Sequence, residues 1–289
     1  MKPTRTAIIA VMCLISLVST DEMALGNTTL GSGAATELNY DQFLHALEMH
    51  HDHIEKHVQD FTCRIFRRYR KDGQLQSRQI LDVKFRNEQA INGNEVQPLN
   101  VYLKVLRPRG SAGQEVLYAQ GNYNDKVLFN NKTLTLTFSP DSSLVRKVSN
   151  LAITEMGFAK VLQRTIDKLK DEESYRKCSF LRYQSKIDGR PCTTYQVTHP
   201  RHSNHGDLHI GRLFIDDKLG VPTRYAMYAW PTEHDPMQLI EECTFSTVRL
   251  NTDLVDADFD PLNGQYGFSS HVVQRELERQ LSQSTADWR

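Results

Sequence analysis

The last third of the chain is patterned as a meander of antiparallel β-strands, and this pattern limits the fold more than any other part of the sequence. Between Lys186 and Phe268 three strand-like runs follow one another: KIDGRPCTTYQVTHP, GRLFIDDKLGVPTRYAMYAWP and LIEECTFSTVRLNTDLVDADFDP. The Asp-Gly pair at 188–189 and the DDKLG segment at 216–220 are turn signals of hairpins. The runs contain no nucleophile motif, metal cage or phosphate loop, so they indicate an architecture and not a reaction.

Alternation with a period of two also covers earlier parts of the chain. Together with the meander it predicts about eleven strands, near 61–70, 78–86, 101–106, 115–119, 126–129, 133–138, 175–186, 192–199, 208–216, 223–230 and 237–250. In the sixth run Leu134, Leu136 and Phe138 share one face opposite threonines, which predicts a half-buried strand. The elements do not alternate as βαβ units, so an antiparallel sheet is expected.

Two segments have the apolar spacing of amphipathic helices instead. One spans 40–60 with Phe43, Leu47 and Ile54 on its stripe, and the other spans 155–172. A sheet of about eleven strands tends to curl and leaves a concave face that needs a cover. The predicted fold class is therefore α+β, mainly antiparallel β: an unclosed, strongly curved half-barrel with helices over the concave face.

The first twenty residues have the pattern of a secretory signal peptide. Lys2 and Arg5 precede an apolar run from Ala7 to Val18, which is too short to cross a bilayer core of ~30 Å. A signal anchor is the alternative interpretation. We expect a signal peptide at 1–20, a flexible leader at 21–37, one domain at 38–268 and a polar tail at 269–289. The protein is then exported, periplasmic or extracellular, with no membrane span after cleavage.

The net charge of the chain disfavours partners that are attracted by a strongly charged protein as a whole. Thirty-five basic and 35 acidic side chains give a formal net charge of zero. A nucleic acid is therefore not an expected partner, and any anionic partner needs a local patch.

Four cysteines follow the predicted leader: Cys63, Cys178, Cys192 and Cys243. In an oxidising compartment they allow three pairings, and the sequence does not choose among them. No CxxC motif is present, which disfavours a zinc ribbon or a redox pair. One structural disulfide and four free thiols both stay open.

Histidines are the most conspicuous candidates for metal ligands or catalytic residues in the sequence. His50, His53 and His57 fall on one stripe of the first helix and are weak candidates for a metal site, with a solvated helix face as the simpler interpretation. A second group around His199 and His209 lacks a matched nucleophile and base. We therefore expect no catalytic residue, no cofactor and no enzyme.

Arginines recur on the first long strand. Arg64, Arg68 and Arg70 share a face with Phe66, and such a face can engage phosphate or carboxylate groups. The more common role of such charges is to protect an outer strand face or edge from aggregation.

A ligand cavity on the concave face is the main functional hypothesis from the residues. Its candidate lining comes from the second helix and from one strand: Phe158, Leu162, Ile166, Tyr225, Met227, Tyr228 and Trp230. Aromatic and Met side chains suit an apolar ligand, although they suit a plain core equally well. Neighbours on one strand point to opposite faces, so this set cannot line one cavity entirely.

Several blocks together resemble a family of exported bacterial proteins that carry an uncharacterised domain. The blocks, over about 60–268, are DFTCRIFRRYRKDGQL, VYLKVLRPRGSAGQEVLYAQG, ITEMG, DGRPCTTYQVTHP, RLFIDDKLGVPTRYAMYAWP and LVDADFDP. More loosely, the chain is similar to periplasmic lipoprotein carriers and outer-membrane lipoprotein-sorting proteins. The resemblance implies an unclosed β-barrel whose concavity holds acyl chains in the carriers. Similar folds also occur in periplasmic regulators that bind a protein partner. The resemblance implies no catalytic residue.

These observations lead to two competing hypotheses. The first is an exported, non-enzymatic protein that binds a lipid, an acylated lipoprotein or another apolar ligand in the half-barrel cavity. The second is a periplasmic sensor or scaffold with a filled core that binds an envelope protein. A metal-binding protein or a hydrolase that depends on histidine is a weaker third.

Overall fold

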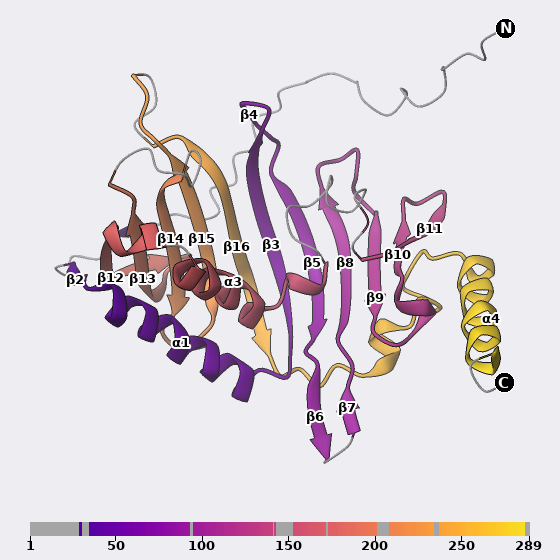
Figure 1. Ribbon diagram of the computed structural model, residues 1–289. Helices are drawn as coiled ribbons and strands as arrows, with labels where there is room; N and C mark the ends of the chain where they lie inside the picture. The colour runs from indigo at the N-terminus through magenta and orange to yellow at the C-terminus, as the bar shows by residue number, and fades with distance from the viewer. Residues whose placement is uncertain are drawn as a thin grey trace, which may run out of the picture.

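The computed structural model describes residues 29–30, 35–92, 95–140, 142, 153–171, 173–200, 208–233 and 237–286. Within them one antiparallel sheet of 14 strands dominates, and a separate hairpin of two strands projects beyond it (Figure 1). The sheet is open and carries helices, so the predicted α+β class is confirmed. The sequence predicted about eleven strands, because the additional ones, such as Gln74–Leu75 (β4), are too short to show alternation.

The sheet consists of two meanders that meet side by side. The N-terminal meander is formed by β3 (Asp60–Lys71), β5 (Gln79–Arg86), β8 (Asn100–Arg107), β9 (Glu115–Ala119), β10 (Val127–Asn130) and β11 (Thr135–Phe138). The C-terminal meander is formed by β12 (Ser179–Ile187), β13 (Arg190–Thr198), β14 (Leu208–Asp216), β15 (Pro222–Ala229) and β16 (Leu239–Leu250). Strands β16 and β3 pair at the centre, with Phe245 opposite Ile65. The projecting hairpin is β6 (Gln89–Asn92) with β7 (Glu95–Gln97).

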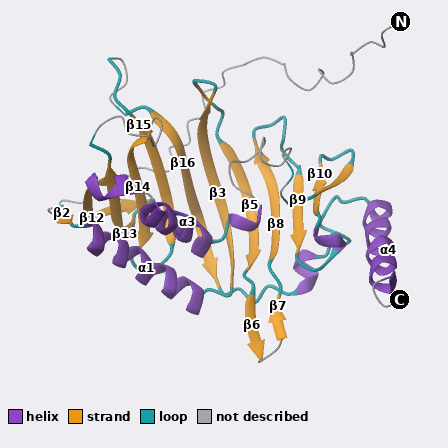
Figure 2. Ribbon diagram, in the orientation of Figure 1, coloured by secondary structure: helices purple, strands orange, loops and turns teal. Residues whose placement is uncertain are grey.

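Two helices lie across the concave face, which we call the inner face (Figure 2). Helix α1 (Tyr40–His57) begins at a capping box, in which the Asn39 side chain accepts from the Gln42 amide at 2.9 Å and the Gln42 side chain accepts from the Asn39 amide at 3.0 Å. Helix α3 (Phe158–Asp171) buries Phe158, Leu162 and Ile166. Both predicted helices are confirmed, with α3 preceded by the 3-10 turn η2 (Ile153–Glu155).

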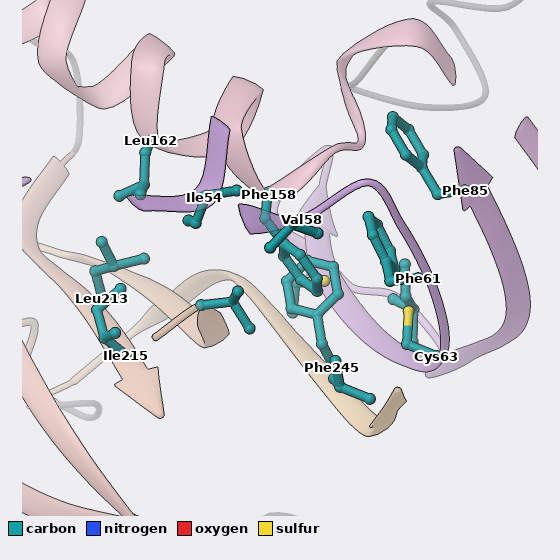
Figure 3. Packing of buried hydrophobic residues seen from close by; sticks show 14 of the residues in the cluster. Ile54, Val58, Phe61, Cys63, Phe85, Phe158, Leu162, Leu213, Ile215 and Phe245 are labelled. Carbon is teal, nitrogen blue, oxygen red and sulfur yellow. The ribbon is translucent and has the colours of Figure 1, made fainter. Parts of the chain in front are cut away.

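Aromatic packing fills the space between the helices and the sheet (Figure 3). The Phe158 ring stacks on Phe61 at 4.2 Å between centroids, and Phe61 stacks on Phe85 at 5.0 Å. Phe245 meets Phe158 edge to face at 5.2 Å. This part of the inner face is therefore a packed core.

The C-terminal segment packs on the opposite, outer face of β8–β10. Val101 and Leu103 belong to the core under the helices, whereas Tyr102 between them belongs to a second cluster with Phe259 and Val273. The second cluster includes η4 (Asp256–Phe259) and helix α4 (Ser270–Ala286), so the stretch predicted to be a polar tail forms a helix with a buried residue.

Three local expectations differ from the structure. Leu134 and Leu136 are 51% and 36% exposed while Thr135 is buried, because β11 is the edge of the sheet and the Thr135 hydroxyl accepts from the Ser269 amide at 2.8 Å. Tyr175 lies in the 3-10 turn η3 (Glu173–Lys177) and not in a strand. Part of the leader predicted at 21–37 pairs with β12, in the strands Thr29–Leu30 (β1) and Thr36–Leu38 (β2), the second of which ends one residue beyond the leader. The signal-peptide residues 1–20 lie outside the described residues.

Within the described chain, we find no helix that combines the length and apolar character needed to span a bilayer.

Candidate ligand-binding groove

A groove of about 710 Å³ lies where α1 ends, α3 begins and the β6–β7 hairpin leaves the sheet. Its lining comes from three stretches of the chain, within 54–58, 85–99 and 154–160, that are far apart in sequence: Ile54, Glu55, Lys56, Val58, Phe85, Asn87, Glu88, Gln89, Ala90, Val96, Leu99, Thr154, Ala159 and Lys160. The volume lies within the range of about 300–1,000 Å³ that is usual for small-molecule sites.

The end of α1 forms one wall of the groove. The Val58 amide donates to the Ile54 carbonyl at 2.9 Å, and Val58 itself is extended, so the helix stops at this point. The Val58 carbonyl accepts from Asn87 Nδ2 at 2.8 Å and from Gln89 Nε2 at 3.3 Å. These bonds hold the start of the β6–β7 hairpin against the helix end.

The start of α3 forms the facing wall, and a glycine permits its close approach. A Cβ atom on Gly157 would lie 2.8 Å from Cζ of Phe85, so a larger residue would push α3 away from β5. Ala159, two residues further on, faces the groove with a small side chain. The floor is thus apolar and well packed, with Ile54, Val58 and Phe85 each at most 2% exposed.

The rim of the groove is charged and mixed in sign. Lys56 and Lys160 contribute ammonium groups, and Glu55 and Glu88 contribute carboxylates. Val96 on the projecting hairpin is 52% exposed and extends the apolar surface outward. An apolar floor under a polar rim matches a ligand with an apolar chain and a polar head. A smaller hollow of about 390 Å³ lies between β2 and α1, lined by Leu38, His45, Ala46 and Arg182 among others.

None of the seven residues predicted to line a cavity lies in the groove lining. Phe158, Leu162 and Ile166 are at most 2% exposed in the packed core. The structure does bring them together, but as a filled interior.

The four predicted lining residues on β15 and just after it lie in different surroundings. Tyr225 packs against the same core, and its hydroxyl donates to Glu241 Oε1 at 3.0 Å. Tyr228 lies under the Arg212 guanidinium, 5.4 Å from Cζ to ring centroid, and Trp230 stacks on His209 at 4.2 Å. Met227 is half-buried.

The weak metal candidates on α1 take up other contacts. His50 Nε2 lies 3.1 Å from the Tyr195 hydroxyl, and the His53 and His57 rings lie 4.8 Å apart. Burial, and then the neighbouring His53, lower the pKa of His50. Across the described residues, no three His, Cys, Asp or Glu side chains are grouped to hold a metal ion.

All four cysteines of the described chain are free. Cys63 and Cys243 lie in the inner core, Cys192 lies in a small outer cluster with Ile187 and Phe214, and Cys178 lies beside His199 with Sγ 3.4 Å from Nδ1. Burial raises the pKa of Cys178 to about 11, so its thiol is protonated at neutral pH. This pair therefore lacks the thiolate that a cysteine nucleophile needs.

The apolar floor was visible in the sequence, but the groove was not. Ile54 belongs to the predicted helical stripe, Val58 lies within the predicted helix at 40–60, and Phe85 belongs to a predicted strand. Their meeting with Leu99 and Ala159 depends on the chain path, so the missing signal is a tertiary one.

The fold and the groove define a class: an open antiparallel half-barrel whose inner face is covered by helices, with a groove at one end. A family model described as a protein of unknown function, DUF1571, matches residues 58–268, and the chain belongs to this family. No curated protein matches the sequence.

Several solved structures are similar to the chain at low sequence identity. A DUF1329 family protein from Desulfovibrio piger is 12% identical over 77% of this chain and 98% of its own, with a TM-score of 0.37. MucB is 12% identical over 75% of this chain with a TM-score of 0.46, and this chain covers 62% of MucB. A LolA superfamily protein from Nitrosomonas europaea is 13% identical over 75% of this chain and 96% of its own, with a TM-score of 0.33.

Proposed function

We propose that this protein is an exported, non-enzymatic binding protein for an apolar chain, carried by a lipid or an acylated protein, and that the groove is its site. The observation that carries the proposal is a space of about 710 Å³ to which Ala90, Val96, Leu99 and Ala159 present partly exposed apolar side chains, above the buried floor. Burial of apolar surface is favourable by ~25 cal/mol per Å², so contact of a ligand with these partly exposed side chains would contribute to affinity.

The rim supplies the second element of recognition. The ammonium groups of Lys56 and Lys160 lie on the two walls of the groove, where an anionic or carbonyl head group of the ligand would meet them. Long Lys stems also cover apolar surface while their charges stay in water. The site therefore fits an amphipathic ligand with its chain along the floor.

A direct test measures uptake of a fluorescent fatty-acyl probe by the purified protein. Ala159→Trp places an indole in the groove and is expected to weaken probe binding at least about tenfold, because a group of that size fills the space the chain needs. Lys168→Trp on the exposed side of the same helix is the matched control and should bind like the parent. Native mass spectrometry of the protein from its host checks for a co-purified lipid.

Two results would reject this function. One is the absence of probe uptake together with no bound lipid, and the other is equal uptake by the Ala159→Trp variant. The second candidate, a scaffold that binds an envelope protein, is favoured by the packed interior around Phe158 and Leu162. It predicts a partner captured by crosslinking in living cells, with a groove that stays empty.

A further inference from the structure

Helices α1 and α3 cover one face of the central and C-terminal strands, and the opposite, outer face of these strands is rich in arginine (Figure 1 shows the two helices). Since Arg67, Leu213 and Tyr225 lie on the inner side, their neighbours in sequence point outward. We call the following set the outer arginine face: Arg64, Arg68, Arg70, Arg78, Arg212 and Arg224. In the described part of the chain, the C-terminal segment packs over β8–β10 and not over this face.

Two carboxylates neutralise only part of the outer arginine face. Arg64 holds Asp82 through two hydrogen bonds of 2.7 and 3.0 Å. Arg224 donates to Glu242 at 2.6 Å, and Arg78 lies 3.8 Å from the other Glu242 oxygen. Arg70 donates only to backbone carbonyls. The face therefore has a local positive surplus although the chain as a whole is neutral.

Like Arg70, Arg68 and Arg212 on this face have no acidic partner among the described residues. Arg68 makes no hydrogen bond or ion pair with any described residue, and its Nε is buried without a partner. Arg212 donates from Nε to the neutral Gln196 at 2.8 Å and lies over the Tyr228 ring. Each keeps charged N–H groups for a partner outside the fold.

The sheet register places these two groups in one row. Arg68 pairs with Glu242, Glu242 with Ala226, and Ala226 with Arg212, so Arg68 and Arg212 are three strand spacings apart. At about 4.8 Å per spacing this separation is about 14 Å.

Protection of a sheet edge does not account for these arginines. Strand β3 lies between β16 and β5 in the middle of the sheet, so its backbone groups are already paired. A half-buried guanidinium with an unsatisfied Nε costs free energy in the isolated protein. The Nη groups of Arg68 are not among the buried polar atoms, so they can meet a partner outside the fold.

We propose that the outer arginine face docks on a lipid surface through the anionic phosphates of its headgroups. Guanidinium groups bind phosphate through paired hydrogen bonds, and a spread of about 14 Å between Arg68 and Arg212 spans more than one headgroup. The amphipathic Tyr228, whose ring lies against the Arg212 guanidinium, suits the interface. A broad sheet face favours a flat, repeating partner over an acidic peptide, for which a binding groove is the usual site.

The test uses the full chain, expressed with its own leader and purified as the host leaves it. Flotation with vesicles of phosphatidylcholine alone is compared with flotation on vesicles that also contain phosphatidylglycerol. We expect binding to the anionic vesicles only, and its loss when salt rises from about 0.1 M to about 1 M, since the screening length falls from about 10 Å to about 3 Å.

Variants connect binding to the named residues. Each basic side chain near an anionic surface contributes about fivefold in partition, so Arg68→Ala/Arg212→Ala is expected to bind about 25-fold more weakly. The matched control is Arg182→Ala/Lys186→Ala, which removes the same charge from exposed positions on β12 and should bind like the parent. Should the double variant fail to fold by circular dichroism, Arg78→Ala, at a half-exposed position, replaces it with an expected fivefold loss.

Three results would overturn the proposal. They are equal flotation on neutral vesicles, equal loss of binding in the control variant, and binding of soluble poly-glutamate through Arg68 and Arg212 without vesicle binding. The last of these would assign the face to an acidic polypeptide. A negative result with the Ala159→Trp variant would reject the proposed groove function but would not bear on vesicle binding, because the groove lies on the inner side of the sheet.

Discussion

Arg67 donates from Nε to Oε1 of Glu241 at 2.9 Å, and both side chains are less than one-tenth exposed on the inner face of the sheet. The Tyr225 hydroxyl donates to the same oxygen. Removing one partner of a buried pair leaves the other charge without compensation in a poorly solvated site. This pair joins β3 to β16, the two strands at which the meanders meet.

The first prediction concerns this pair. Glu241→Ala is expected to lower the free energy of unfolding by about 3–5 kcal/mol, measured by urea denaturation. The double variant Arg67→Met/Glu241→Leu replaces the pair by apolar groups of similar size and should cost far less. If the single and double variants lose the same free energy of unfolding, the unpaired charge is not the cause of the destabilisation.

The second prediction separates the core from the groove. Leu162 is fully buried, so Leu162→Ala should cost about 2–5 kcal/mol of stability through lost contacts and a new cavity. Acyl-probe binding of the folded variant should stay unchanged, because Leu162 does not line the groove. A selective loss of probe affinity in this variant would instead support the cavity under α3 that the sequence predicted.

The third prediction concerns pH. Burial and the neighbouring His53 hold the pKa of His50 below its ordinary value of 6.5, so protonation is harder in the folded than in the unfolded state. The stability from neutral His50 is complete above pH 6.5 and is lost as pH falls through the lowered pKa. His50→Gln should therefore lose less stability than the parent between about pH 7.5 and about pH 5. The exposed His45→Gln on the same helix should behave like the parent.

The fourth prediction concerns the cysteines. Burial raises the pKa of Cys243 to about 12 and raises the pKa of Cys63 well above its ordinary value, so neither forms a thiolate in the folded protein. Iodoacetamide should leave both unmodified under native conditions and label both after denaturation, as read by peptide mass mapping. Recovery of a disulfide between any two of the four described cysteines in the native protein would contradict the arrangement.

The fifth prediction concerns the attachment of the C-terminal segment. Glu115 is 2% exposed and accepts from the Tyr102 hydroxyl at 2.7 Å, from Asn130 Nδ2 at 3.0 Å and from the Gly267 amide at 2.7 Å. Glu115→Ala leaves these donors unpaired, each at a cost of about 1–3 kcal/mol. Faster amide exchange at 265–273 is expected, and unchanged exchange there would contradict the role. Glu88→Ala, on the groove rim, is the control.

Much of the architecture was predictable because it rests on local patterns. The stripe with Phe158, Leu162 and Ile166 defines a helix wherever it packs, and the alternation around Arg64 and Arg68 defines strand faces. The prediction of buried residues was wrong at the edge of the sheet, where Leu134 and Leu136 are exposed. Periodicity shows which residues share a face of a strand but not which face is covered.

The sequence by itself determined the antiparallel strands, the two covering helices and the blocks that mark the family. Only the tertiary structure decided that Phe158 fills a core, that Ala159 beside it borders a groove, and that Arg68 and Arg212 stand in one row. The physical reason is the separation in sequence of the residues that interact. Periods of two and 3.6 arise between near neighbours, whereas a groove built from Val58, Phe85 and Ala159 exists only after distant segments pack together.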